Sequence, residues 1–125
     1  MIAGVYNITC EQGATFTRDI VLKEPDPTDP TGTTYQEMDL ENYTARMQVR
    51  RTTESTSFQV ELTTENGRIS IEPAGVKGRI VLSMDDSTTA SLTSDGVYDL
   101  EIISGAGVVS RVLKGTFTLS LEVTR

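Results

Sequence analysis

Apolar and polar residues alternate with a period of two along most of this chain. The alternating segments are TFTRDIVLK, YTARMQVR, SFQVEL, RISIE, GRIVLSM, VYDLEI and GTFTLSLEV. Because successive side chains of a β-strand point to opposite faces, this pattern predicts strands with one buried face. The residues expected to face the core are Phe16, Ile20, Leu22, Tyr43, Ala45, Met47, Val49, Phe58, Val60, Leu62, Ile69, Ile71, Ile80, Leu82, Met84, Tyr98, Leu100, Ile102, Phe117, Leu119, Leu121 and Val123. Arg18 interrupts the apolar face of its segment, which indicates a sheet edge or a bend there.

Turn-forming residues separate the predicted strands. EQG at 11–13 ends a first strand over residues 5–10. Asn-Gly within 65–67 favours a hairpin, because both residues tolerate positive φ. PAGVKG at 73–78 and SGAG at 104–107 join two further pairs of adjacent strands by the same logic.

One segment, MDDSTTASL, departs from the strand pattern. Asp85 or Asp86 is suited to cap a short helix, and Ala90 and Leu92 are placed to turn inward. The sequence therefore predicts one short helical turn near residues 86–92, linking two strands across the ends of the sheets.

These elements predict an all-β fold built as a single domain over residues 1–125. A chain of 125 residues suits one domain with a sizeable core. About eight or nine short antiparallel strands with regular turns favour a β-sandwich of the Ig-like or jelly-roll-like kind. A small barrel is the alternative architecture.

A long proline-rich loop is expected over residues 24–39. It holds three of the four prolines of the chain, Pro25, Pro27 and Pro30. Because proline cannot donate to a ladder, the segment is predicted not to be a strand but an exposed, semi-rigid excursion. Loops of this length are functional or disordered. We interpret the segment either as a tolerated insertion or as a contact arm that orders against a neighbouring subunit, with Tyr35 and Met38 as its anchors.

The net charge and the lack of a secretion signal or membrane helix argue against nucleic-acid-binding, secreted and membrane proteins. The net charge of −7 has the wrong sign for nucleic acid or an anionic membrane surface. The N-terminal stretch lacks the basic and apolar regions of a secretion signal. No run of residues approaches the roughly 20 apolar residues of a membrane helix.

Catalytic and metal-binding constellations are not found in the sequence. The chain has no histidine, which excludes Ser-His-Asp and Cys-His triads, and its one cysteine excludes an internal disulfide. Cys10 is interpreted as a small core residue. The carboxylates are spread over different turns, and the spacing of Asp26 and Asp29 is not that of a calcium loop. We therefore expect no enzyme activity, no small-molecule substrate, no cofactor and no metal.

A local basic strip is predicted on the polar face of one strand. Arg46 and Arg50 share that face, and Arg51 lies just beyond. The favoured interpretation is cross-strand pairing with glutamates of a neighbouring strand, such as Glu61. The alternative is an interface with an acidic neighbour, including a second copy of the chain.

The order of the segments resembles a group of small β-sandwich proteins and domains of tailed bacteriophages. It is similar to the N-terminal domains that fix receptor-binding appendages to the upper baseplate. The resemblance covers nearly the whole chain and rests on YNITCEQGATFTRDIVLK, DLENYTARMQVRR, LTTENGRISI, GRIVLSM, TASLTSDGVYDLEI and GVVSRVLKGTFTLSLEVTR. The sequence departs from the appendage proteins by ending directly after the last predicted strand.

The resemblance implies a non-enzymatic virion structural protein of the tail or baseplate, an adaptor between tail core and tail fibre. Its partners would be other virion proteins in a multi-copy symmetric assembly, formed in the host cytoplasm. The expected partner-binding residues are Pro25, Pro27, Pro30, Tyr35, Met38, Arg46, Arg50 and Arg51. A capsid decoration protein is the alternative function. A carbohydrate-binding module is a lower alternative, since the chain has no tryptophan on which to stack sugars.

Overall fold

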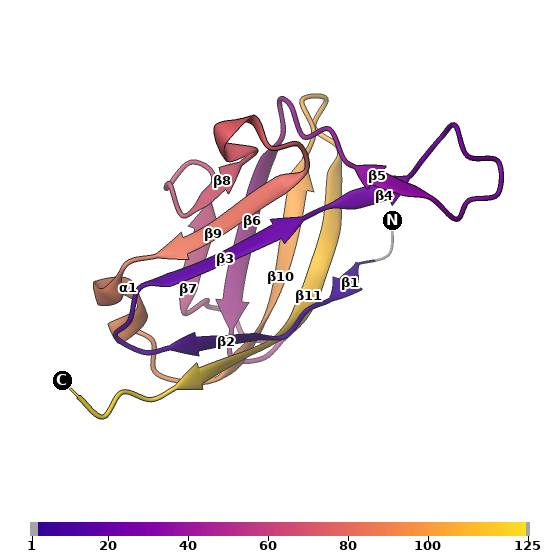
Figure 1. The fold of residues 1–125 in the computed structure, drawn as a ribbon. Coiled ribbons are helices and arrows are strands. Elements are labelled where there is room, and N and C mark those ends of the chain that lie inside the picture. Colours follow the sequence, from indigo (N-terminus) through magenta and orange to yellow (C-terminus); the bar gives the residue numbers. More distant parts are fainter. Residues whose placement is uncertain (1–2, 125) are drawn as a thin grey trace.

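A computed structural model describes residues 3–124 and shows two β-sheets packed face to face, with a hairpin that projects from one end (Figure 1). The described residues form eleven strands and two short helices. In chain order these are β1 (Gly4–Val5), β2 (Ile8–Glu11), β3 (Phe16–Val21), β4 (Lys23–Pro25), β5 (Tyr35–Glu37), β6 (Thr44–Arg50), β7 (Val60–Thr63), β8 (Ile69–Ile71), η1 (Pro73–Gly75), β9 (Arg79–Met84), α1 (Asp86–Ala90), β10 (Gly96–Ile103) and β11 (Val109–Ser120).

The predicted β-sandwich is confirmed. The larger sheet has the order β1-β11-β10-β6-β7, with β2 also paired to β11, and the smaller sheet has the order β3-β9-β8. Strands β4 and β5 pair with each other and form the projecting hairpin. One hydrophobic cluster fills the space between the two sheets, with contributions from both. Alternating positions of β6 and β9 supply it, as the period-two pattern predicts.

Strand direction differs from the prediction at the N-terminus. Strands β1 and β2 both run parallel to β11, with Val5 opposite Lys114 and Cys10 opposite Leu119. The strand predicted over residues 5–10 is interrupted where Asn7 turns its side chain to accept the N–H of Thr116 at 3.1 Å. The expectation of antiparallel strands throughout was therefore wrong here, because alternation of side chains carries no information on strand direction.

The Asn-Gly turn does not make a hairpin. It connects β7 of the larger sheet to β8 of the smaller sheet. Gly67 has the expected positive φ of 80°, and the Asn66 side chain accepts the N–H groups of Thr63 and Arg68, both at 3.0 Å. The turn residues form a tight bend as predicted, but the strand that follows belongs to the other sheet, on the far side of the core. By contrast, residues 73–78 and 104–107 do join adjacent antiparallel strands, β8 to β9 and β10 to β11.

Helix α1 forms where predicted and is capped by Asp85. Its carboxylate accepts the N–H of Thr88 at 2.8 Å. Leu92 is buried as expected, but Ala90 is exposed and Thr89 is the buried helical residue. The Thr89 hydroxyl can face the core because it donates to the carbonyl of Ala14 at 2.8 Å.

Two predicted strands are shorter than their patterns. Phe58 lies before the start of β7 and is 46% exposed. Strand β11 ends at Ser120, where its partner β2 ends at Glu11, so Leu121 and Val123 are exposed. Alternation of apolar and polar residues does not show where strand pairing ends, because pairing also needs a neighbouring strand.

Candidate interaction surfaces

The proline-rich segment is a β-hairpin with an exposed tip, which we call the arm and define as residues 23–37. Strand β4 lies beside β5 (Figure 1). In their register, Lys23 pairs with Glu37 and Pro25 pairs with Tyr35. The prediction that this segment contains no strand was wrong. Pro25 is tolerated because the hydrogen bonds of the hairpin come from the residues on either side of it, such as Asp26 N–H to the carbonyl of Thr34 at 2.9 Å.

Two aspartates organise the tip of the arm. Asp26 Oδ1 accepts the N–H of Thr28 at 2.9 Å. Asp29 Oδ1 accepts the N–H of Thr31 at 2.9 Å, and its Oδ2 accepts the N–H of Thr34 at 2.9 Å. Hydrogen bonds from the threonine side chains and backbone hold the pKa of Asp29 far below its usual range and lower that of Asp26. The arm therefore has its own internal order and needs no neighbour to supply it.

The base of the arm is fixed to the sandwich. Leu22 N–H donates to the carbonyl of Gly78 at 2.8 Å, and its own carbonyl accepts the N–H of Met38 at 2.9 Å. Gly78, with φ of 77°, leaves no room for a side chain, because an added Cβ would lie 2.8 Å from the carbonyl oxygen of Leu22. The arm thus leaves the smaller sheet in a defined direction.

The predicted arm residues divide into exposed and buried ones. Pro25, Pro27 and Pro30 are exposed, and Tyr35 is 60% exposed. Met38 is only 8% exposed and belongs to the core cluster. The interpretation of Met38 as a docking anchor is therefore corrected: it holds the arm to its own domain, while Tyr35 is left as the large side chain that the arm presents.

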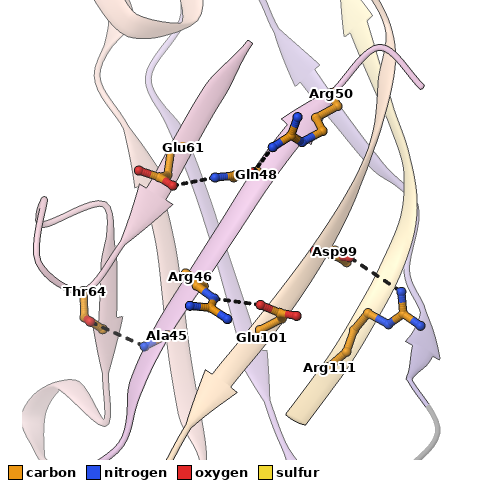
Figure 2. Close-up of polar contacts among 9 residues, drawn as sticks. All are labelled: Ala45, Arg46, Gln48, Arg50, Glu61, Thr64, Asp99, Glu101 and Arg111. Atoms are coloured by element: carbon orange, nitrogen blue, oxygen red, sulfur yellow. Dashed lines mark hydrogen bonds and ion pairs between the residues drawn. The ribbon is translucent and has the colours of Figure 1, made fainter. Parts of the chain in front are cut away.

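The arginines of the predicted basic strip make intramolecular contacts (Figure 2). Arg46 on β6 forms an ion pair with Glu101 on β10, with Nε and Oε1 2.7 Å apart. Arg50 donates to Gln48 Oε1 at 2.7 Å and to the Ser55 carbonyl at 2.8 Å. Cross-strand pairing is therefore confirmed for Arg46.

The expected partner of the basic strip was wrong. Glu61 accepts from Gln48 Nε2 at 2.7 Å instead of from an arginine. Arg51 lies beyond the strand, with Nη2 3.4 Å from the Thr93 hydroxyl. Arg50 makes no ion pair within residues 3–124, so its charge is held between neutral acceptors.

Sequence reasoning missed the hollow beside this strip. A shallow cavity of about 690 Å³ lies on the outer face of the larger sheet, over β6, β10 and β11. Asp99 and Arg111 line it, with Oδ2 and Nη1 3.7 Å apart, and Lys114 lies opposite Asp99 in the strand register. The outward positions of VYDLEI and VSRVLK carry these charges, but only the pairing of β10 with β11 brings them together.

Two buried titratable groups serve the packing. Burial raises the pKa of the Cys10 thiol, which is fully buried. Burial also raises the pKa of Tyr98 to about 12, and the Tyr98 hydroxyl donates to the carbonyl of Tyr6. Both residues join the N-terminal strands to the rest of the larger sheet.

Metal clusters and membrane helices are not found in the described part of the chain. Residues 3–124 contain no group of three or more His, Cys, Asp or Glu side chains arranged to hold a metal ion. Within the same residues, no helix has the length and apolar character needed to cross a membrane.

Comparison with known proteins adds no argument about the fold or the function of this chain. No family model matches the chain, and no curated protein matches it. Among solved structures, it is similar to a chain in the crystal structure of ICOS in complex with ICOS-L and an anti-ICOS-L VNAR domain. That similarity has 13% sequence identity and a TM-score of 0.49, and it covers 96% of this chain and 56% of the other. The assignment as a β-sandwich rests on the strand pairing described above.

Proposed function

We propose that the chain is a structural protein of tailed-phage virions, an adaptor of the tail or baseplate that connects the tail core to a tail fibre. Two observations support the proposal. The sequence resembles phage adaptor domains along nearly its whole length, and the sandwich carries a projecting arm that is organised before any partner binds.

The arm is the observation that carries the proposal. Its base is tied to the core through Leu22 and Met38, and its tip is held by Asp29. A rigid projection loses little conformational freedom when it docks, so that small contacts can add up across a symmetric assembly. Tyr35 and the three prolines form the surface that it offers to a neighbouring virion protein.

The test of location is mass spectrometry of phage particles separated into heads and tails. Recovery of the chain with the tail fraction supports the adaptor function. Recovery with the heads, in many more copies, contradicts it and identifies a capsid decoration protein. Absence from both fractions excludes a virion role.

The test of the arm replaces residues 27–33 by Asn-Gly. This change keeps the hydrogen-bonded pair of Asp26 and Thr34 and closes the hairpin with a two-residue turn. We expect a folded protein that is not incorporated into particles when it is supplied in trans. Tyr35→Ala is the matched single change, and Phe58→Ala, at another exposed aromatic, is its control. Normal incorporation of both the shortened protein and Tyr35→Ala would exclude the arm as the docking element.

A further inference from the structure

The smaller sheet has a long open edge made by β3 and β4. The two strands are separated only by Leu22, whose N–H bonds to Gly78 and whose carbonyl bonds to Met38. Residues 16–25 therefore form one almost continuous edge, along which an extended chain rises about 3.4 Å per residue. In an antiparallel ladder only every second residue bonds to a given neighbour. Since Leu22 bonds inward, Asp19, Val21 and Lys23 direct their backbone N–H and C=O groups outward.

The outward backbone groups of Asp19, Val21 and Lys23 have no hydrogen-bond partner among residues 3–124. The two ends of the edge are different. The Thr17 carbonyl accepts from Arg18 Nη1 at 2.8 Å, and Pro25 has no N–H to donate. The edge can therefore pair with another strand over residues 19–23, and this pairing would be limited at Thr17 on one side and Pro25 on the other.

In the larger sheet, by contrast, the backbone groups of the edge strand β7 are occupied by side chains of the same chain. On β7, the Glu61 carbonyl accepts from Asn66 Nδ2 at 3.0 Å and from Arg68 Nη1 at 2.9 Å. The Thr63 N–H donates to Asn66 Oδ1 at 3.0 Å. Side chains that occupy edge groups in this way prevent the pairing of strands between molecules. The edge of β3 and β4 has no such protection at its centre.

The residues along the open edge complement themselves in an antiparallel arrangement. They read Arg18, Asp19, Ile20, Val21, Leu22, Lys23 and Glu24. When a second copy pairs with its Val21 opposite Val21, Asp19 lies opposite Lys23 of the second copy. In the same register Arg18 lies opposite Glu24 of the second copy, and Ile20 lies opposite Leu22. On the exposed face, Asp19 and Lys23 therefore each meet the opposite charge, and the two-fold symmetry gives this contact twice. Arg18 and Glu24 also bond within their own chain, to the Thr9 carbonyl and to Gln36.

The backbone pattern fits the same register. The pairs formed by Val21 with Val21, and by Asp19 with Lys23, bring together residues whose N–H and C=O groups face outward. At the ends, Thr17 lies opposite Pro25 of the second copy. Its carbonyl would find no donor there, and this carbonyl is the one that Arg18 already satisfies. The exposed charges of Asp19 and Lys23 and the backbone hydrogen-bonding pattern thus favour the same register.

We propose that the edge formed by β3 and β4 binds a second copy of this chain, giving a two-fold dimer with a continuous sheet centred on Val21. The dimer is a property of the isolated protein and does not depend on the proposed virion function. Asp19 also pairs with Arg79 of its own chain at 2.7 Å, so the contact extends an existing ion pair into a network.

The test uses two single charge reversals, Asp19→Lys and Lys23→Glu. Each variant alone places like charges opposite one another at two symmetric positions, and we expect its dimer to dissociate about tenfold more readily or worse. A mixture of the two variants restores opposite charges at both positions, so the mixture should form heterodimers as wild type forms homodimers. Sedimentation velocity over a range of concentrations measures all three samples.

Matched controls are Glu65→Lys and Arg51→Glu, which make the same charge changes at exposed positions just after β7 and β6 of the larger sheet. Both controls should dimerise like wild type, and thermal melting of every variant checks folding. A wild type that stays monomeric at high concentration overturns the proposal. Single variants that dimerise as well as wild type, or a mixture that is not rescued, also overturn it.

Discussion

The Glu72 carboxylate accepts the backbone N–H of Gly78 at 2.9 Å, at the point where the arm meets the smaller sheet. The same oxygen, Oε2, accepts the N–H of Leu40 at 3.1 Å. One side chain therefore satisfies two backbone donors from segments on either side of the base of the arm.

Replacement of Glu72 by Ala is expected to destabilise the fold by about 1–3 kcal/mol, because two partly buried donors lose their acceptor. Glu72→Gln keeps a carbonyl oxygen and should stay closer to wild type. Urea unfolding measures both, with Glu65→Ala as an exposed control. An equal loss in the Ala and Gln variants would show that the carboxylate charge matters more than its role as acceptor.

The order of the arm tip should resist acid. The folded-state pKa of Asp29 is depressed from its ordinary value of 3.8, so its contribution is complete above the unfolded pKa and is lost as the pH falls through the folded one. The amide signals of Thr31 and Thr34 should therefore stay unchanged at pH near 3.8 and move only well below it. NMR titration measures this. Movement with a midpoint at the ordinary aspartate value would contradict the prediction.

Substitution of Gly115 by Ala should displace the N-terminal strand. A Cβ at this position would lie 2.3 Å from the carbonyl oxygen of Tyr6. Overpacking against backbone typically costs about 1–3 kcal/mol. Gly4→Ala is the control, because its Cβ would meet Leu113 at an ordinary 3.5 Å. Thermal unfolding of the two variants should separate them clearly, and equal melting temperatures would contradict the close approach.

The ion pair of Arg46 and Glu101 should contribute little to stability. The two side chains are 53% and 29% exposed, and such pairs are worth about 0–1 kcal/mol. A double-mutant cycle with Arg46→Gln and Glu101→Gln measures the coupling. A coupling energy well above this range would mean that the neighbouring Gln48 and Arg50 act with the pair as a network.

Side-chain alternation and local turn chemistry made part of the fold predictable from the sequence. The buried faces of β6, β9 and β10 and the turn at 104–107 were predicted correctly, and Asp85 was one of the two residues proposed as the helix cap. The features that were not predicted depend on neighbouring strands. Whether β1 runs parallel or antiparallel to β11, and whether the Asn66 turn leads to the same sheet or the opposite one, is decided by packing across the core.

The arm shows the same limit. Proline content favoured an irregular loop, but a proline blocks strand pairing only where its nitrogen would have to donate. At Pro25 the nitrogen lies on the open side, so the hairpin forms. Met38 was predicted to be an exposed anchor because it lies in a polar, proline-rich segment. In the structure its backbone N–H bonds to the Leu22 carbonyl at the base of the arm, and its side chain belongs to the core cluster.

The position of Cys10 has a practical consequence. Its thiol is fully buried where β2 lies against β11, and it is the one cysteine of the chain. A thiol reagent can reach it only when this part of the sheet opens. The rate of labelling therefore reports how often β2 detaches from β11, without any engineered probe. A partner that clamps this strand in place would reveal itself by slowing the reaction.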